Sequence, residues 1–136
     1  MWKFDPEHPK PELISMKQVF IIDDDEATRI LILEIFEGTN IELFEAGCGE
    51  EGMELFRKYS YSLDLILLDI ILPIYSGWEL IKMFKEIKPL IPVVALSALP
   101  TKELAMKCRL AGFNTWLSKP FEKDEILKLI NIFQER

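Results

Sequence analysis

The stretch Leu65-Ile66-Leu67-Leu68-Asp69 decides the fold of this chain, because four apolar residues in a row are followed by a carboxylate. A short apolar run between polar residues is typical of a strand buried on both faces, as in the middle of a parallel sheet. An Asp at the end of such a strand either caps the next helix or presents its carboxylate at the carboxyl edge of the sheet, where ligands of open α/β sheets bind. Pro73 and Gly77 follow and indicate a shaped loop before the next helix, which favours the second role.

Strands and helices alternate five times on either side of this stretch. The other strands are expected over residues 19–22, 41–46, 92–96 and 115–117. Helices are expected over residues 27–37 and 50–59, from a capping box at Ser76 and Glu79 to Pro89, between Pro100 and Gly112, and over 123–134. Such an alternation with short connections predicts a doubly wound parallel sheet with helices on both faces.

Apolar spacing indicates the first helix, and for the last helix it also predicts which residues face the core. The positions that indicate the first helix are Ala27, Ile30, Leu31 and Leu33, with Gly38 ending it. The last helix is expected to bury Ile126, Leu127, Ile130 and Phe133.

Length, charge and cysteines narrow the class of protein. The 136 residues fit one domain, which we place at 17–136, and residues 1–16, with three prolines, are expected to form a flexible leader. No output domain is expected after the fifth helix. A net charge of -7 argues against nucleic-acid binding, and no apolar run is long enough to span a membrane. Without a signal peptide or paired cysteines, a cytoplasmic location is expected.

Four acids, Asp23-Asp24-Asp25-Glu26, follow the first strand. Asp25 suits a helix N-cap and Glu26 suits the first turn, where the helix dipole favours negative charge. Asp23 and Asp24 remain, and they repel each other unless a cation offsets their charge.

Polar residues end most of the strands and can converge at one edge of a parallel sheet. They are Asp23, Asp24, Asp69, Ser97 and Lys119. A few oxygen ligands suit Mg²⁺, which would stabilise the oxygens of a transferring phosphoryl group, and an Asp carboxylate is a known nucleophile for that transfer. A zinc site or a nucleophilic triad is disfavoured because His8 is the only histidine and the thiols are far apart.

Four motifs, each closing a strand, resemble the receiver domains of two-component response regulators over about residues 17–136. They are Asp23-Asp24-Asp25, Asp69 with Leu72-Pro73 and Gly77, Ser97-Ala98, and Lys119-Pro120-Phe121. The resemblance, which is to stand-alone, chemotaxis-regulator-like receivers, implies a flavodoxin-like (βα)5 fold with strand order 2-1-3-4-5.

The same resemblance implies roles for the residues at the first and third strands. Asp69 matches the phosphoacceptor, and Asp24 and Asp69 match direct ligands of Mg²⁺. Asp23 matches a ligand that acts largely through water, and Ile71 would contribute its backbone carbonyl to the metal.

The resemblance to receiver domains also implies roles for three further positions. Ser97 matches the hydroxyl that binds the phosphoryl group and moves on activation, and Lys119 matches the cation that pairs with Asp69 and then with the phosphoryl oxygens. Lys119-Pro120 resembles the family's cis peptide. Trp116 stands at the aromatic switch position, where the family more often has Tyr or Phe. The alternative for Trp116 is a half-buried strand aromatic with no switching role.

Ile71 and Leu99 occupy two loop positions that, in the family, tune the loss of the phosphoryl group. Both are apolar and cannot orient an attacking water. A long-lived aspartyl phosphate is therefore expected.

The function implied is a switch that accepts a phosphoryl group from a phosphohistidine on a histidine kinase or a histidine phosphotransfer protein. It would alter the binding of a downstream protein through the surface of the fourth helix, fifth strand and fifth helix, as a monomer or weak dimer. It would catalyse only its own phosphorylation and dephosphorylation.

Three alternatives stay open to different degrees. A constitutive interaction module would keep the fold without the chemistry, although it would have no need to hold three repelling carboxylates together. A phosphatase with an Asp nucleophile would usually have an acid where Ile71 stands. A flavin-binding protein would have a Ser/Thr/Gly-rich loop where this chain has acids.

Overall fold

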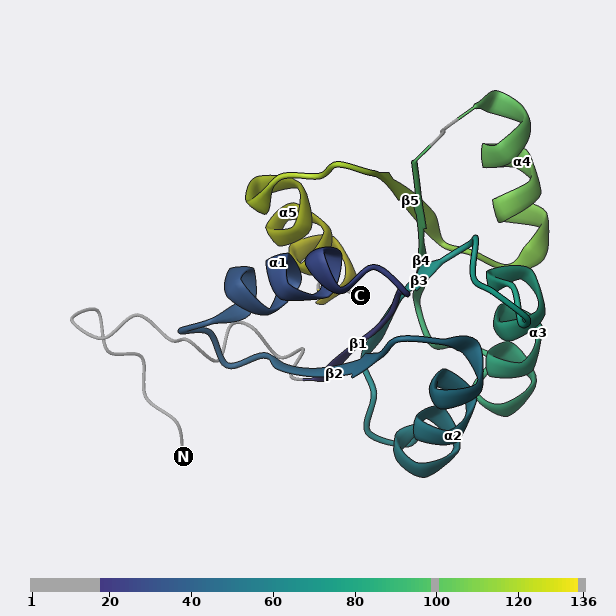
Figure 1. Cartoon of the computed structure of the whole chain (residues 1–136), viewed down its shortest axis with the longest axis horizontal. Helices are drawn as coiled ribbons and strands as arrows, with labels where there is room; N and C mark the ends of the chain where they lie inside the picture. The colour runs from purple at the N-terminus through teal and green to yellow at the C-terminus, as the bar shows by residue number, and fades with distance from the viewer. Residues whose placement is uncertain (1–17, 99–100, 135–136) are drawn as a thin grey trace.

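A computed structural model describes residues 18–98 and 101–134 and shows five strands alternating with five helices (Figure 1). The elements are β1 (Gln18–Ile22), α1 (Glu26–Phe36), β2 (Glu42–Ala46), α2 (Gly49–Tyr59), β3 (Leu65–Asp69), α3 (Gly77–Ile87), β4 (Val93–Ser97), α4 (Lys102–Ala111), β5 (Thr115–Ser118) and α5 (Lys123–Gln134). The expected leader, residues 1–16, and Pro100 lie outside the described residues.

The five strands form one parallel sheet in the order β2-β1-β3-β4-β5. The predicted doubly wound α/β fold and strand order are therefore confirmed. β3 lies in the middle, with Leu68 opposite Ile22 of β1 and Ala95 of β4. All five residues of β3 are buried, as its continuous apolar sequence predicts.

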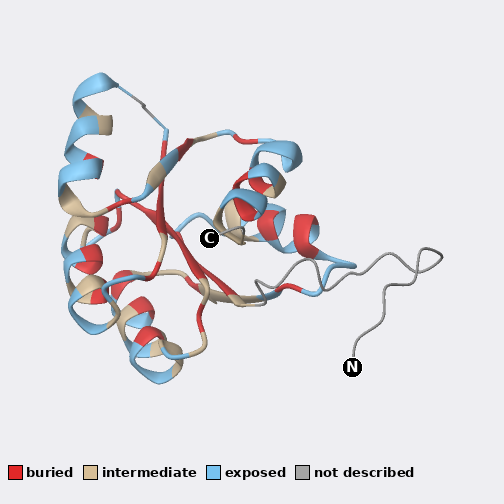
Figure 2. Cartoon of the chain, turned by 180° about the vertical axis from the view of Figure 1, so that it is seen from behind, coloured by how far each residue is buried: buried red, intermediate tan, exposed pale blue. Residues whose placement is uncertain are grey.

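Helices cover both faces of the sheet, α1 and α5 on one and α2, α3 and α4 on the other (Figure 1). Alternate residues of β3 serve the two layers. Leu65 and Leu67 pack in the cluster under α1 and α5, whereas Ile66 and Leu68 pack in the cluster under α2, α3 and α4. Figure 2 shows the resulting pattern, with buried strands between helices that are exposed on their outer sides.

Helix α1 forms where the sequence predicts it, and its burial shows which side meets the sheet. The helix buries Ile32, Ile35 and Phe36, whereas Ile30 and Leu33 are about half exposed. Apolar residues occur on both sides of this helix, so their spacing alone does not determine which side meets the sheet.

The predicted core face of α5 is partly right. Ile126 and Ile130 are buried as expected, and Leu129 joins them. Leu127 and Phe133 pack against the core but remain partly exposed.

The helices begin and end largely at the capping residues that the sequence predicts. The N-caps of α1 and α3 are Asp25 and Ser76, whose side chains accept hydrogen bonds from Ala27 and Glu79. Gly112 ends α4 in the left-handed conformation. Among the described residues no helix is long and apolar enough to cross a membrane.

Candidate functional site

The sheet brings the predicted polar residues to its carboxyl edge. Asp23 follows β1, and its N–H donates to the carbonyl of Ala46 in β2 at 3.1 Å. Asp69 ends β3 and Ser97 ends β4. These three are the buried polar or charged residues of the described chain, with Asp23 fully inaccessible. Burying such groups is costly unless they are paired, which marks this edge as a specialised site.

Three carboxylates form a compact cluster at this edge. Asp23, Asp24 and Asp69 each offer an oxygen, and these oxygens all lie within 4.8 Å of one another. Asp24 is exposed, so the cluster is open to solvent on its side. Asp25, in contrast, caps α1 by accepting from the N–H of Ala27 at 3.1 Å and from the hydroxyl of Thr28 at 2.8 Å.

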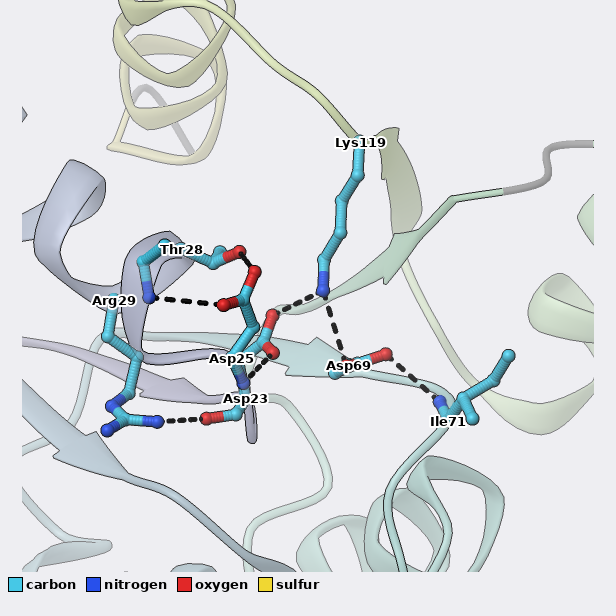
Figure 3. A network of polar contacts seen from close by, with 8 residues as sticks. Asp23, Asp25, Thr28, Arg29, Asp69, Ile71 and Lys119 are labelled. Carbon is cyan, nitrogen blue, oxygen red and sulfur yellow. Dashed lines mark hydrogen bonds and ion pairs between the residues drawn. The ribbon is translucent and has the colours of Figure 1, made fainter.

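Lys119 places its ammonium between the two buried carboxylates (Figure 3). Its Nζ lies 2.6 Å from Oδ2 of Asp23 and 3.3 Å from Oδ2 of Asp69. Burial alone would lower the pKa of Lys119, but the contacts with Asp23 and then Asp69 outweigh it and raise that pKa above its usual value. Lys119 is therefore a permanent cation at the site.

The surroundings of Asp69 oppose the ionisation of its carboxyl group. Burial, and then the negative charge of Asp23, raise the pKa of Asp69 from 3.8 to about 6, although the Ile71 N–H and Lys119 favour its ionised form. It is ionised at neutral pH yet poorly neutralised, which suits a nucleophile or a metal ligand.

The loop after β3 fixes the direction of the Asp69 side chain. The N–H of Ile71 donates to Oδ1 of Asp69 at 3.0 Å, and the N–H of Gly77 donates to the carbonyl of Ile70 at 2.9 Å. A Cβ atom at Gly77 would lie 2.6 Å from the carbonyl oxygen of Asp69, so a side chain there would displace the loop. The Ile71 side chain points away, 77% exposed.

Ser97 and Trp116 occupy different parts of this edge. Ser97 is buried next to Leu96, the strand partner of Asp69, and its carbonyl accepts from the N–H of Lys119 at 2.7 Å. Trp116 of β5 pairs with Ala95 of β4 and is 36% exposed, and it is not a member of the acidic cluster. The predicted cis Lys119-Pro120 bond is present. Leu99 lies outside the described residues.

The donor set fits a small hard cation. All three ligand candidates are carboxylates, and oxygen ligands in this number, with room for water beside exposed Asp24, suit Mg²⁺. Oδ2 of Asp23 is buried and has no aligned hydrogen-bond donor among the described residues, although it touches the Lys119 ammonium. A bound cation would offset the negative charge of the three carboxylates that this one ammonium leaves.

The sequence interpretation missed one residue beside this cluster. Arg29, in α1, donates from Nη1 to the backbone carbonyl of Asp23 at 2.5 Å (Figure 3). Its Nε also pairs with Glu45 at 3.4 Å. A positive charge in the first turns of a helix is unfavourable with the helix dipole, and that feature could have identified it.

The comparisons with known proteins agree with this geometry. The family model for the response regulator receiver domain matches residues 19–131. The cell cycle transcriptional regulator CtrA of Caulobacter vibrioides is 32% identical over 119 residues, which cover 88% of this chain and 51% of that protein. The chain thus spans about half the length of the curated relatives it matches.

Solved structures show the same likeness. The receiver domain of the Francisella response regulator 1452 is 30% identical, with a TM-score of 0.79 over 88% of this chain and 98% of that one. The CheX-CheY-BeF3-Mg²⁺ complex of Borrelia burgdorferi contains a chain that is 28% identical, with a TM-score of 0.78 over 86% of this chain and 89% of that one. The chain therefore belongs to the response regulator receiver domains of two-component signalling, with the fold of the stand-alone CheY-like receivers.

Proposed function

We propose that Asp69 accepts a phosphoryl group from a phosphohistidine of a histidine kinase or a histidine phosphotransfer protein, with Mg²⁺ bound beside it. The observation that carries this proposal is the cluster of Asp23, Asp24 and Asp69 oxygens within 4.8 Å, next to the Lys119 ammonium. Asp24 and Asp69 would bind the metal directly and Asp23 through water, with the Ile71 carbonyl as a further ligand. Mg²⁺ supplies charge neutralisation for the phosphoryl oxygens.

The residues of the chain support the transfer itself. A carboxylate oxygen of Asp69 forms the new O–P bond while the P–N bond of the phosphohistidine breaks. The electron pair of the broken P–N bond stays on the imidazole nitrogen. The Ile71 N–H holds Oδ1 of Asp69, and Lys119 contacts Oδ2 from the other side. After the transfer, Lys119 can contact the phosphoryl oxygens in place of Asp69. Its ion pair with Asp23 keeps it at the site both before and after phosphorylation.

The signal would leave the site through Ser97 and Trp116. Ser97 is buried at the end of β4, from which its hydroxyl would bind the phosphoryl group. Trp116 lies on β5 and is exposed enough to change its position when the end of β4 moves. The surface of α4, β5 and α5 would then bind a downstream protein differently.

The aspartyl phosphate would be long-lived because the exposed Ile71 side chain cannot orient water toward it. We expect Ile71→Gln to shorten the lifetime of the phosphorylated form, whereas Ile71→Leu leaves it unchanged. The lifetime is measured as the decay of the phosphorylated mass after removal of the donor. Equal decay of wild type and Ile71→Gln would contradict this role.

The proposal is tested by incubating the protein with Mg²⁺ and acetyl phosphate and recording intact mass. Wild type should gain one base-labile phosphoryl group, and Asp69→Asn should gain none. Wild type in EDTA is the control for the metal. No adduct on folded wild type with Mg²⁺ would support a constitutive interaction module instead.

A further inference from the structure

We propose that Arg29 is a positioning residue that holds the Asp23–Asp24 peptide in the orientation needed for cation binding. This inference rests on the proposed function, because it assigns a role toward the cation that Asp23, Asp24 and Asp69 would bind. Arg29 belongs to α1 and has no contact with Asp69 among the described hydrogen bonds and ion pairs. It acts through the backbone of Asp23.

The guanidinium of Arg29 contacts Asp23, which follows β1, and Glu45 of β2. The Arg29 side chain is 19% exposed, and Nη1 donates to the Asp23 carbonyl (Figure 3). Its Nε pairs with Glu45. Gly47 lies against the guanidinium, since a Cβ atom at this position would be 3.4 Å from Nη1. A guanidinium bonded to a carbonyl is a charge-assisted hydrogen bond, stronger than a neutral one.

The contact with the Asp23 carbonyl determines how the next residue is presented. A trans peptide is planar, so the carbonyl of Asp23 and the N–H of Asp24 point in opposite directions. Fixing the carbonyl toward Arg29 on the β2 side therefore fixes the whole peptide that joins the two acids. The Asp23 side chain is fixed as well, by the Asp25 N–H at 2.9 Å and by Lys119.

Electrostatics and positioning predict opposite effects of removing Arg29. A positive charge beside a divalent-cation site repels the cation, so loss of the charge alone should strengthen binding. Loss of the hydrogen bond releases the peptide that carries two ligands, and outer-shell partners of metal ligands commonly change affinity by about 10-fold or more. The direction of the change in affinity thus separates the two roles.

A third role for Arg29 would be purely structural, as an ion-paired link between α1 and β2. A variant of Glu45, its partner in that ion pair, is the matched control for this role. Glu45→Gln removes the ion pair with Arg29 but leaves the hydrogen bond to the Asp23 carbonyl. If Arg29 only fastens the helix, both Arg29→Met and Glu45→Gln should lower stability without changing Mg²⁺ affinity.

The experiment measures Mg²⁺ dissociation constants by calorimetry for wild type, Arg29→Met, Arg29→Lys and Glu45→Gln, and urea unfolding of each without metal. We expect Arg29→Met to bind Mg²⁺ about 10-fold more weakly. Arg29→Lys, which keeps the charge and one donor, should fall between it and wild type, and Glu45→Gln should stay within about twofold of wild type.

Each outcome decides one question. Arg29→Met binding Mg²⁺ as tightly as wild type, or more tightly, would overturn the positioning role. If Arg29→Met does not fold without metal, Arg29→Lys carries the test, and wild-type affinity in that variant would overturn the role. Wild type that does not bind Mg²⁺ would instead overturn the proposed function, independently of Arg29.

Discussion

Asp69 is more costly to ionise in the folded chain than in the unfolded one. Its pKa rises to about 6 because burial and the charge of Asp23 oppose ionisation more than Lys119 and the Ile71 N–H favour it. The folded protein therefore binds a proton at Asp69 more tightly than the unfolded chain does. Its contribution to stability is present below about pH 4 and is lost as the pH rises through about 6.

Asp69→Asn removes this ionisation, so the variant should be more stable than wild type at pH 7.5 without metal, by roughly 1–3 kcal/mol. The difference should shrink as the pH falls toward 4, where Asp69 is neutral in both states of wild type. Urea unfolding at several pH values in EDTA measures it. A difference that is constant with pH would contradict the raised pKa.

Ile74 is the described non-glycine residue with a left-handed backbone, at φ 68°, and its side chain is 90% exposed. That conformation costs an L-residue roughly 1–2 kcal/mol, and a β-branched side chain is especially poorly suited to it. Tyr75 beside it packs closely on Gly49 of α2, where a Cβ atom would lie 2.7 Å from that of Tyr75. The loop after β3 is thus held in a strained form by its neighbours.

Ile74→Gly should raise the free energy of unfolding by about 1 kcal/mol, because glycine adopts this conformation without the steric cost. Leu90→Gly is the matched control, since Leu90 is 87% exposed and is not among the positive-φ residues of the described chain. Chemical denaturation compares the two. Stabilisation by both substitutions, or by neither, would show that backbone strain at Ile74 is not the cause.

At the level of single elements, α1 shows how a helix with apolar residues on two sides is oriented. Ile32 is completely buried, while its neighbour Leu33 is 49% exposed. The exposed apolar side of α1 is continuous with a surface groove of about 530 Å³ that Leu33 shares with Ile41 and Leu43.

We expect Ile32→Ala to lower the free energy of unfolding by about 2–4 kcal/mol, since it removes a fully buried side chain from the core. Leu33→Ala, one residue further along the same helix, should change it by less than about 1 kcal/mol. Thermal or urea unfolding of the pair tests the orientation of α1. Equal losses would mean that the helix is rotated from the position described here.

At the scale of the whole molecule, parallel topology assembles the site from distant parts of the chain. Asp69 and Lys119 are 50 residues apart in sequence, yet their side chains form a hydrogen bond. The order β2-β1-β3-β4-β5 places the ends of β1, β4 and β5 around that of β3, and one edge thereby receives Asp23, Ser97 and Lys119. Ligands of open α/β sheets bind at such an edge.

The polar residues at this edge could be predicted from the sequence, because short apolar runs locate the strands. In a parallel sheet, the polar residues that follow those strands all lie at the carboxyl edge. The sequence was insufficient where the outcome depends on tertiary packing. The orientation of α1 and the left-handed backbone at Ile74 depend on tertiary neighbours, and the contact of Arg29 with the Asp23 carbonyl depends on where its side chain turns after β1. The roles of Trp116 and Ile71 remain predictions.

Of the three adjacent carboxylates, Asp69 is the one proposed to form the acyl phosphate. Borohydride reduction of protein treated with Mg²⁺ and acetyl phosphate converts an aspartyl phosphate into homoserine, and peptide mass spectrometry then locates that residue. We predict homoserine at position 69 alone, and none in protein treated without the donor. Homoserine at position 23 or 24, or at no position in protein that has gained a phosphoryl group, would contradict the assignment.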